Sequence, residues 1–218
     1  MTADRGDIYR YLGCRDSQPP AELRQMVEDC LAALEKAVAP RRVYRLYPLD
    51  EAVEGTVRFG GLSLDSRDLA ALLEGCGMVA LLGVTLGPQA DTLIRRSEKL
   101  EMSRAVVLDA CASALAEAQA EDCQREAEAT SGLRAVGRFS PGYGDLPLEE
   151  QGRLLALLDA PRRIGLTLTG GGMLVPVKSI VALAGLRTGE PAGVSRICGG
   201  KCASCGKSDC PYRAVLGS

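Results

Sequence analysis

Apolar residues recur at helical spacing in several parts of the chain, and each of these parts predicts an amphipathic helix. In residues 21–38 the apolar side chains fall every three or four positions, after Pro19 and Pro20 and before Pro40. Asp65 or Ser66 is suited to cap a short helix that follows it. The further segments that predict helices are residues 68–75, 89–100, 103–128 and 148–160.

Runs of branched and aliphatic residues predict strands between these helices. The predicted strands are residues 42–49, 56–64, 78–86, 164–169 and 178–186. The connector at 170–177, GGGMLVPV, is too long for a tight hairpin, so we expect a turn or a binding loop there. Because strands and helices do not alternate regularly, the pattern favours an α+β fold. The composition shifts toward glycine and cysteine after Arg187, which divides the chain into a domain at 1–196 and a tail at 197–218.

The composition of the 218 residues excludes several classes of function. A formal net charge of −2 gives no electrostatic basis for binding nucleic acid or an anionic membrane. No apolar run reaches the ~20 residues that span a bilayer, and the N-terminus lacks the apolar core of a signal peptide, so a cytoplasmic location is expected. The chain has no histidine. Its absence excludes Ser-His and Cys-His nucleophilic pairs, imidazole metal ligands and a histidine general base.

Polar side chains follow one face of the predicted helix at 103–128. They stand at four-residue steps: Asp109, Ser113, Glu117, Glu121 and Arg125. Two interpretations are open. The stripe faces water, with Glu121 and Arg125 paired across a turn, or part of it lines a binding site.

The segment RFSPGYGDLP, Arg138 to Pro147, predicts a loop with binding chemistry. Arg138 carries a planar fork that matches a carboxylate or phosphate. Pro141 stiffens the backbone, Gly142 permits close approach to a ligand, and Tyr143 adds an amphipathic ring. Structural turns use the same residues, so composition alone leaves both interpretations open.

The nine cysteines fall into two groups. Five are scattered and are expected to be buried small side chains or surface thiols. The other four stand at C-x3-C-x2-C-x4-C spacing in the tail: Cys198, Cys202, Cys205 and Cys210. Four thiolates at these intervals can hold zinc or an iron–sulfur cluster, and the alternative is a tail that carries no metal.

The order of the residues resembles the activation domain of cobalamin-dependent methionine synthase. The resemblance rests on Arg-x-x-x-Gly-Tyr at 138–143, the upstream helix with DACASALAEAQAE, and the later IGLTLT and Pro-Val-Lys-Ser segments. It is best from Ser103 to Leu186. RYLGC at 10–14 and VTLG at 84–87 are similar to segments of free-standing, single-domain versions. The resemblance implies a single domain with a mixed or antiparallel twisted sheet and flanking helices.

The resemblance also implies a site for S-adenosylmethionine. The residues that it places there are Arg138, Ser140, Pro141, Gly142, Tyr143, Glu117 and Asp109. Arg138 would bind the ligand carboxylate, Glu117 its amino group, and the backbone of residues 140–142 would border the adenosine. Tyr143 would lie near the sulfonium, since the face of an aromatic ring attracts a cation.

The chain departs from the family pattern at three points. Gly170, Gly171 and Gly172 follow Thr169 where the family has Thr-Glu-Ser, and Ala184 with Gly185 stands in place of a Tyr-Phe pair. An aspartate of the family's N-terminal segment has no counterpart. These departures concern adenine stacking and part of the polar contacts to the ligand.

The function implied is reductive methylation of cob(II)alamin on a partner methionine synthase that lacks its own activation domain. A flavodoxin- or ferredoxin-like donor would supply the electron, and the chain would position S-adenosylmethionine without a general base. Two alternatives remain open. One is a non-catalytic chaperone or regulator of a corrinoid protein, and the other is a small metal or redox protein that acts through its cysteine tail.

Overall fold

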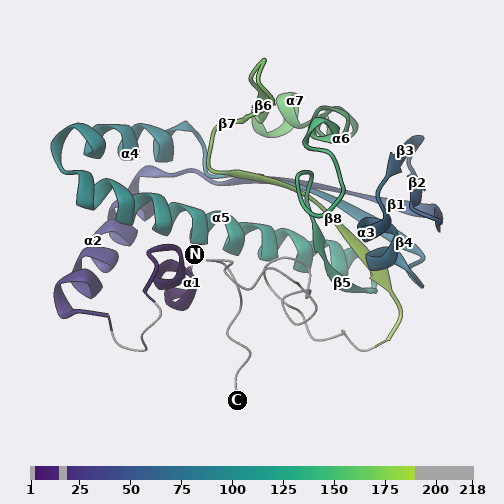
Figure 1. Ribbon diagram of the computed structural model, residues 1–218, viewed down its shortest axis with the longest axis horizontal. Helices are drawn as coiled ribbons and strands as arrows, with labels where there is room; N and C mark the ends of the chain where they lie inside the picture. Colours follow the sequence, from purple (N-terminus) through teal and green to yellow (C-terminus); the bar gives the residue numbers. More distant parts are fainter. Residues whose placement is uncertain (1–2, 15–18, 190–218) are drawn as a thin grey trace.

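An antiparallel six-stranded sheet organises the part of the chain that the computed structural model describes, residues 3–14 and 19–189 (Figure 1). Its strand order is β3-β2-β1-β4-β8-β5. The strands are β1 (Arg41–Val53), β2 (Thr56–Phe59), β3 (Leu62–Asp65), β4 (Met78–Thr85), β5 (Arg134–Phe139) and β8 (Ser179–Arg187). A separate small hairpin pairs β6 (Thr167–Leu168) with β7 (Leu174–Val175).

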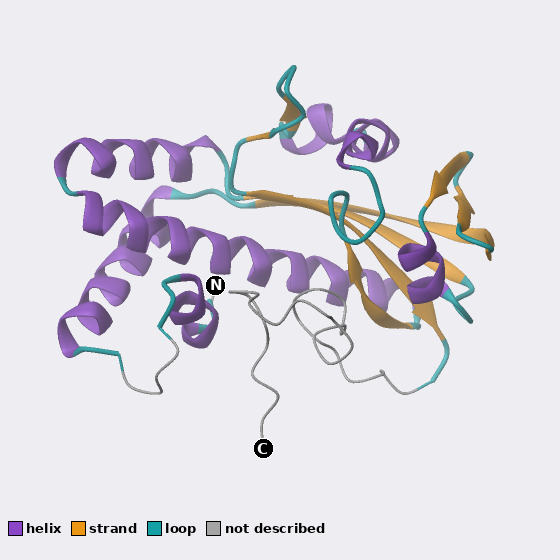
Figure 2. Cartoon of the chain, in the orientation of Figure 1, coloured by secondary structure: helices purple, strands orange, loops and turns teal. Residues whose placement is uncertain are grey.

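Helices cover both faces of this sheet (Figure 2). They are α1 (Arg5–Tyr11), α2 (Ala21–Ala37), α3 (Arg67–Leu73), α4 (Pro88–Leu100), α5 (Met102–Ser131), α6 (Gln151–Leu158) and α7 (Ala160–Ile164), with a 3-10 turn at Leu148–Glu150. The predicted α+β class, with an antiparallel sheet and flanking helices, is confirmed.

Successive side chains of β4 point to opposite faces of the sheet, so they pack into two separate layers of the core. Val79 and Leu81 pack with residues of α3, α6 and α7, whereas Ala80 and Leu82 pack against the second half of α5. The first half of α5 packs with α1, α2 and α4 in a third cluster. Helix α5 therefore connects the sheet to the helical end of the molecule (Figure 1).

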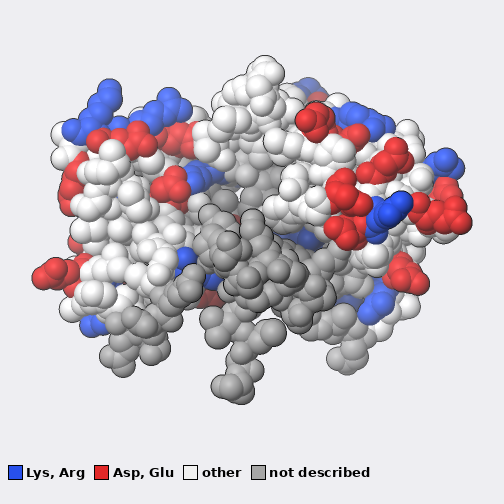
Figure 3. Space-filling view, in the orientation of Figure 1, with Lys and Arg blue, Asp and Glu red and all other residues white. Residues whose placement is uncertain are grey.

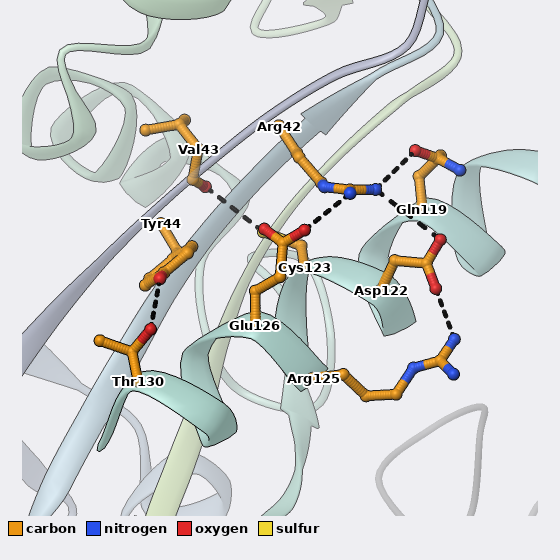
Figure 4. Close-up of polar contacts among 9 residues, drawn as sticks. All are labelled: Arg42, Val43, Tyr44, Gln119, Asp122, Cys123, Arg125, Glu126 and Thr130. Atoms are coloured by element: carbon orange, nitrogen blue, oxygen red, sulfur yellow. Dashed lines mark hydrogen bonds and ion pairs between the residues drawn. The ribbon is translucent and has the colours of Figure 1, made fainter. Parts of the chain in front are cut away.

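Polar contacts fix the second half of α5 on β1 (Figure 4). The Arg42 guanidinium donates to Gln119 Oε1 at 3.2 Å and lies 2.6 Å from Glu126 Oε1. Arg125 pairs with Asp122, three residues earlier on the helix, at 2.5 Å. Residues between the expected polar positions thus hold the helix on the sheet.

The structure corrects three sequence predictions. Residues 56–64 form two strands, because Gly60 and Gly61 adopt φ values of 55° and 79° and turn the chain into a hairpin. The strand expected at 164–169 is wrong over most of its length, since the segment starts at the end of α7 and only Thr167–Leu168 are extended. Conversely, the sequence predicts a loop at Arg138, yet this residue belongs to β5 at the edge of the sheet.

Charges of both signs lie side by side over α4 and over the β2–β3 end of the sheet (Figure 3). The β6–β7 hairpin between them contains no charged side chain from Thr167 to Val177. Across the described residues, no helix is long and apolar enough to cross a membrane.

Candidate functional site

A cavity of about 670 Å³ lies between the middle of α5 and the start of β8. The α5 wall carries Asp109, Ser113 and Glu117, so the first three members of the polar stripe line one cavity. Helix α1 contributes Tyr11, and the loop after β5 contributes Tyr143. Helix α4 contributes Ile94 and the carboxylate Glu98, and the opposite wall is formed by residues 177–180.

Arg138 reaches this cavity through Glu117. Its Nη2 donates to Glu117 Oε2 at 3.1 Å and its Nη1 donates to Gln124 Oε1 at 3.1 Å. The Arg138 side chain is 15% exposed and that of Glu117 is 27% exposed. Gln124 lies seven residues after Glu117 and therefore on the same face of α5. The two residues together hold the guanidinium fork.

Glu117 is a carboxylate whose burial is only partly compensated. Burial raises its pKa, while the charge of Arg138 and its hydrogen bond lower it by less. The neighbouring Tyr11 has its pKa raised to about 12, first by burial and then by the charge of Glu117. A second cation next to Glu117 would favour the ionised carboxylate and compensate its burial.

Asp109 takes part in a second polar group of the cavity wall. Lys178 Nζ lies 2.8 Å from Asp109 Oδ1 and donates to Ser113 Oγ at 3.0 Å. The Lys178 side chain is 12% exposed, whereas that of Asp109 is 56% exposed. The cavity thus has one ion pair at Glu117 and another at Lys178, on the same side of α5.

The predicted loop forms a closed turn between β5 and the 3-10 turn. Tyr143 N donates to Ser140 O at 3.0 Å, and Gly142 N donates to Leu146 O at 2.9 Å. Gly142 has φ of 88°, a conformation that favours glycine. The Tyr143 ring meets Phe139 edge-on, with 6.3 Å between the ring centroids.

The structure therefore places three of the seven predicted ligand residues on the wall of one cavity. Asp109, Glu117 and Tyr143 line it, Arg138 contacts Glu117, and residues 140–142 form the turn that carries Tyr143. The tail cysteines lie outside the described residues, as does the expected boundary at 196. In the part that is described, no group of three or more His, Cys, Asp or Glu side chains is arranged to hold a metal.

Sequence reasoning missed Tyr11, Gln124 and Lys178. Tyr11 lies within the RYLGC segment and Lys178 within the Pro-Val-Lys-Ser segment, so the resemblance pointed to both stretches without giving either residue a role. The only sequence signal for Gln124 is its position two helical turns after Glu117, which places both residues on the same face of the helix.

The structure explains one departure from the family pattern. Gly185 lies in β8 under α3, where an added Cβ would come within 2.7 Å of Cys76 Sγ and of Leu73 Cδ2. A large aromatic ring at this position would displace the core. Gly170–Gly172 instead form the tip of the β6–β7 hairpin, where Gly172 N donates to Thr169 O at 3.0 Å.

The comparisons with known proteins agree with this architecture. No family model matches the sequence, and no curated protein matches it significantly. Among solved structures, the chain is similar to the reactivation domain of MetH bound to AdoHcy (S-adenosylhomocysteine), with a TM-score of 0.62 and 20% identity. The match covers 78% of this chain and 66% of that one.

The chain has a methionine synthase reactivation-domain fold. The resemblance seen in the sequence is thus confirmed for the fold.

Proposed function

We propose that this chain binds S-adenosylmethionine in the α5–β8 cavity and supports reductive methylation of cob(II)alamin on a partner methionine synthase. The observation that carries the proposal is that Glu117, which is paired with Arg138, lines the cavity together with Tyr143. An amino acid group offers one cation and one carboxylate, which match Glu117 and Arg138 respectively. The exposed ring of Tyr143 is suited to a sulfonium.

The structural neighbour supports this choice of ligand, because that reactivation domain, which has a similar fold, is bound to AdoHcy. In the proposed reaction an external donor gives one electron to the partner's cobalt, the sulfonium transfers its methyl group to that cobalt, and S-adenosylhomocysteine leaves. The chain's part is to position the sulfonium and to complement its charges. We place this activity in the cytoplasm, where the free cysteines of the described residues would stay reduced.

Calorimetry with S-adenosylmethionine and S-adenosylhomocysteine tests the binding step. We expect the wild-type chain to bind both. A corrinoid-loaded methionine synthase without its own activation domain, supplied with a flavodoxin or ferredoxin, tests the reaction. Methylation that depends on this chain is the expected result.

The packed glycine at 185 favours a second candidate, a regulator of a corrinoid protein that has kept the fold and lost ligand binding. Absence of S-adenosylmethionine binding, both with and without the corrinoid partner, would select this candidate over the first.

A further inference from the structure

The turn that carries Tyr143 is attached to helix α3 by one carboxylate. Asp145 Oδ2 accepts from the backbone N–H of Arg67 at 2.8 Å, and Oδ1 accepts from that of Asp68 at 3.2 Å. Oδ1 also accepts from the Ser66 hydroxyl at 2.5 Å. These contacts lower the pKa of Asp145, chiefly through Ser66, so the carboxylate stays ionised at neutral pH.

Ser66 links this carboxylate to the helix itself. The residue is buried, at 3% exposure, and its Oγ accepts from Leu69 N at 3.0 Å as the helix cap. The hydroxyl proton is then available for Asp145. One serine therefore joins the first turn of α3 to the turn after β5.

The backbone around Asp145 is pressed against the same helix. Gly144 has φ of 52°, and a Cβ there would lie 2.2 Å from Asp68 Oδ2, so a larger residue would displace the Asp68 side chain and strain the turn. The next residue, Leu146, is buried at 2% exposure in the core cluster that includes Phe139 and α3. The turn thus has one side fixed on α3 and the core, and its other side presents Tyr143 to the cavity.

We propose that Asp145 is a positioning residue that holds residues 140–143 ready for the nucleoside end of the ligand. This role rests on the proposed function. A turn already fixed in its bound shape loses less freedom on binding, so the ligand binds more tightly. Arg138 and Glu117 are held by strand and helix. The Asp145 carboxylate instead bonds to residues 66–68, so binding of the amino acid end should not depend on it.

The test compares three ligands on the full-length chain: S-adenosylhomocysteine by calorimetry, and adenosine and methionine by competition against it. Asp145→Ala should lower the affinity for S-adenosylhomocysteine and for adenosine about five- to tenfold. Methionine should bind as to the wild type. Asp145→Asn keeps an acceptor for Ser66 and should recover part of the loss. The matched control is Asp65→Asn, an exposed carboxylate next to Ser66, which should leave all three affinities unchanged.

Amide hydrogen exchange supplies a second readout. In Asp145→Ala the amides of Gly142, Tyr143 and Leu146 should exchange faster, while those of β8 stay protected. If Asp145→Ala fails to fold, Asp145→Asn provides the same comparison in a milder form. Equal losses for adenosine and methionine, or unchanged adenosine affinity in both variants, would overturn the positioning role while leaving the proposed function in place. A wild-type chain that binds none of the three ligands would overturn the proposed function and this role together.

Discussion

Replacing Arg138 by methionine tests the centre of the proposed site. The substitution keeps an unbranched side chain of similar reach and removes the guanidinium fork. Glu117 then loses its ion pair at 3.1 Å, and Gln124 Oε1 loses its donor. Because Arg138 is the main influence that lowers the pKa of Glu117, that pKa should rise further in the variant.

The structure sets the size of the expected changes in unfolding free energy and in ligand affinity. Removing one partner of a buried ion pair costs about 3–5 kcal/mol, and the partial exposure of Glu117 reduces this to about 2–3 kcal/mol of unfolding free energy. A hydrogen bond to a charged group contributes about 1.5–3 kcal/mol, so ligand affinity should fall about 10- to 100-fold. The second effect is separable from the first because binding is measured on the folded protein.

Urea unfolding and calorimetry with S-adenosylhomocysteine measure the two quantities. The matched control is Arg134→Met on the same strand, whose side chain is 61% exposed and lies 3.9 Å from Glu128. It should change the unfolding free energy by less than about 1 kcal/mol and leave binding unchanged. In the double variant Arg138→Met, Glu117→Gln, stability should partly recover because no buried charge is left alone, whereas binding should not.

Wild-type affinity in folded Arg138→Met would refute the assignment of the carboxylate contact. A loss of binding that the Arg134→Met control shares would refute it equally, since a general loss of positive charge on β5 would then explain the result.

Three further predictions follow from the same geometry. The affinity for S-adenosylmethionine should fall as the pH drops through the raised pKa of Glu117, because only the ionised carboxylate attracts an ammonium; Glu117→Gln should flatten this pH profile, and an unchanged profile would exclude Glu117. Tyr143→Leu should weaken the binding of S-adenosylmethionine about two- to fivefold more than that of S-adenosylhomocysteine, since only the former carries the sulfonium. An equal loss of affinity for the two ligands in calorimetry would contradict a cation–π contact. Gly185→Ala should lower the unfolding free energy by about 1–3 kcal/mol, because its Cβ would overlap Cys76, whereas Gly170→Ala has open space; thermal unfolding that treats both alike would contradict the packing.

Much of the fold could be predicted from hydrophobic spacing, because each amphipathic helix records its own buried face. Helices α2, α4 and α5 lie where that spacing placed them, and so do the central strands β4 and β8. The sequence did not predict strand β5, because Gly137 and two arginines interrupt its apolar pattern. Its pairing with β8 is also irregular near Gly137. Short extended segments in such a sequence depend on a neighbour for their conformation.

The sequence by itself determined the positions of the long elements, the absence of histidine chemistry and the polar stripe on α5. Only the tertiary structure decided which members of that stripe share a cavity and with whom they pair. The reason is the strand order β4-β8-β5, which brings Arg138 to Glu117 and Lys178 to Asp109, two turns apart on one helix face. Periodicity is a local property of the chain, whereas the partner of a buried charge is set by strands and helices that meet only after folding.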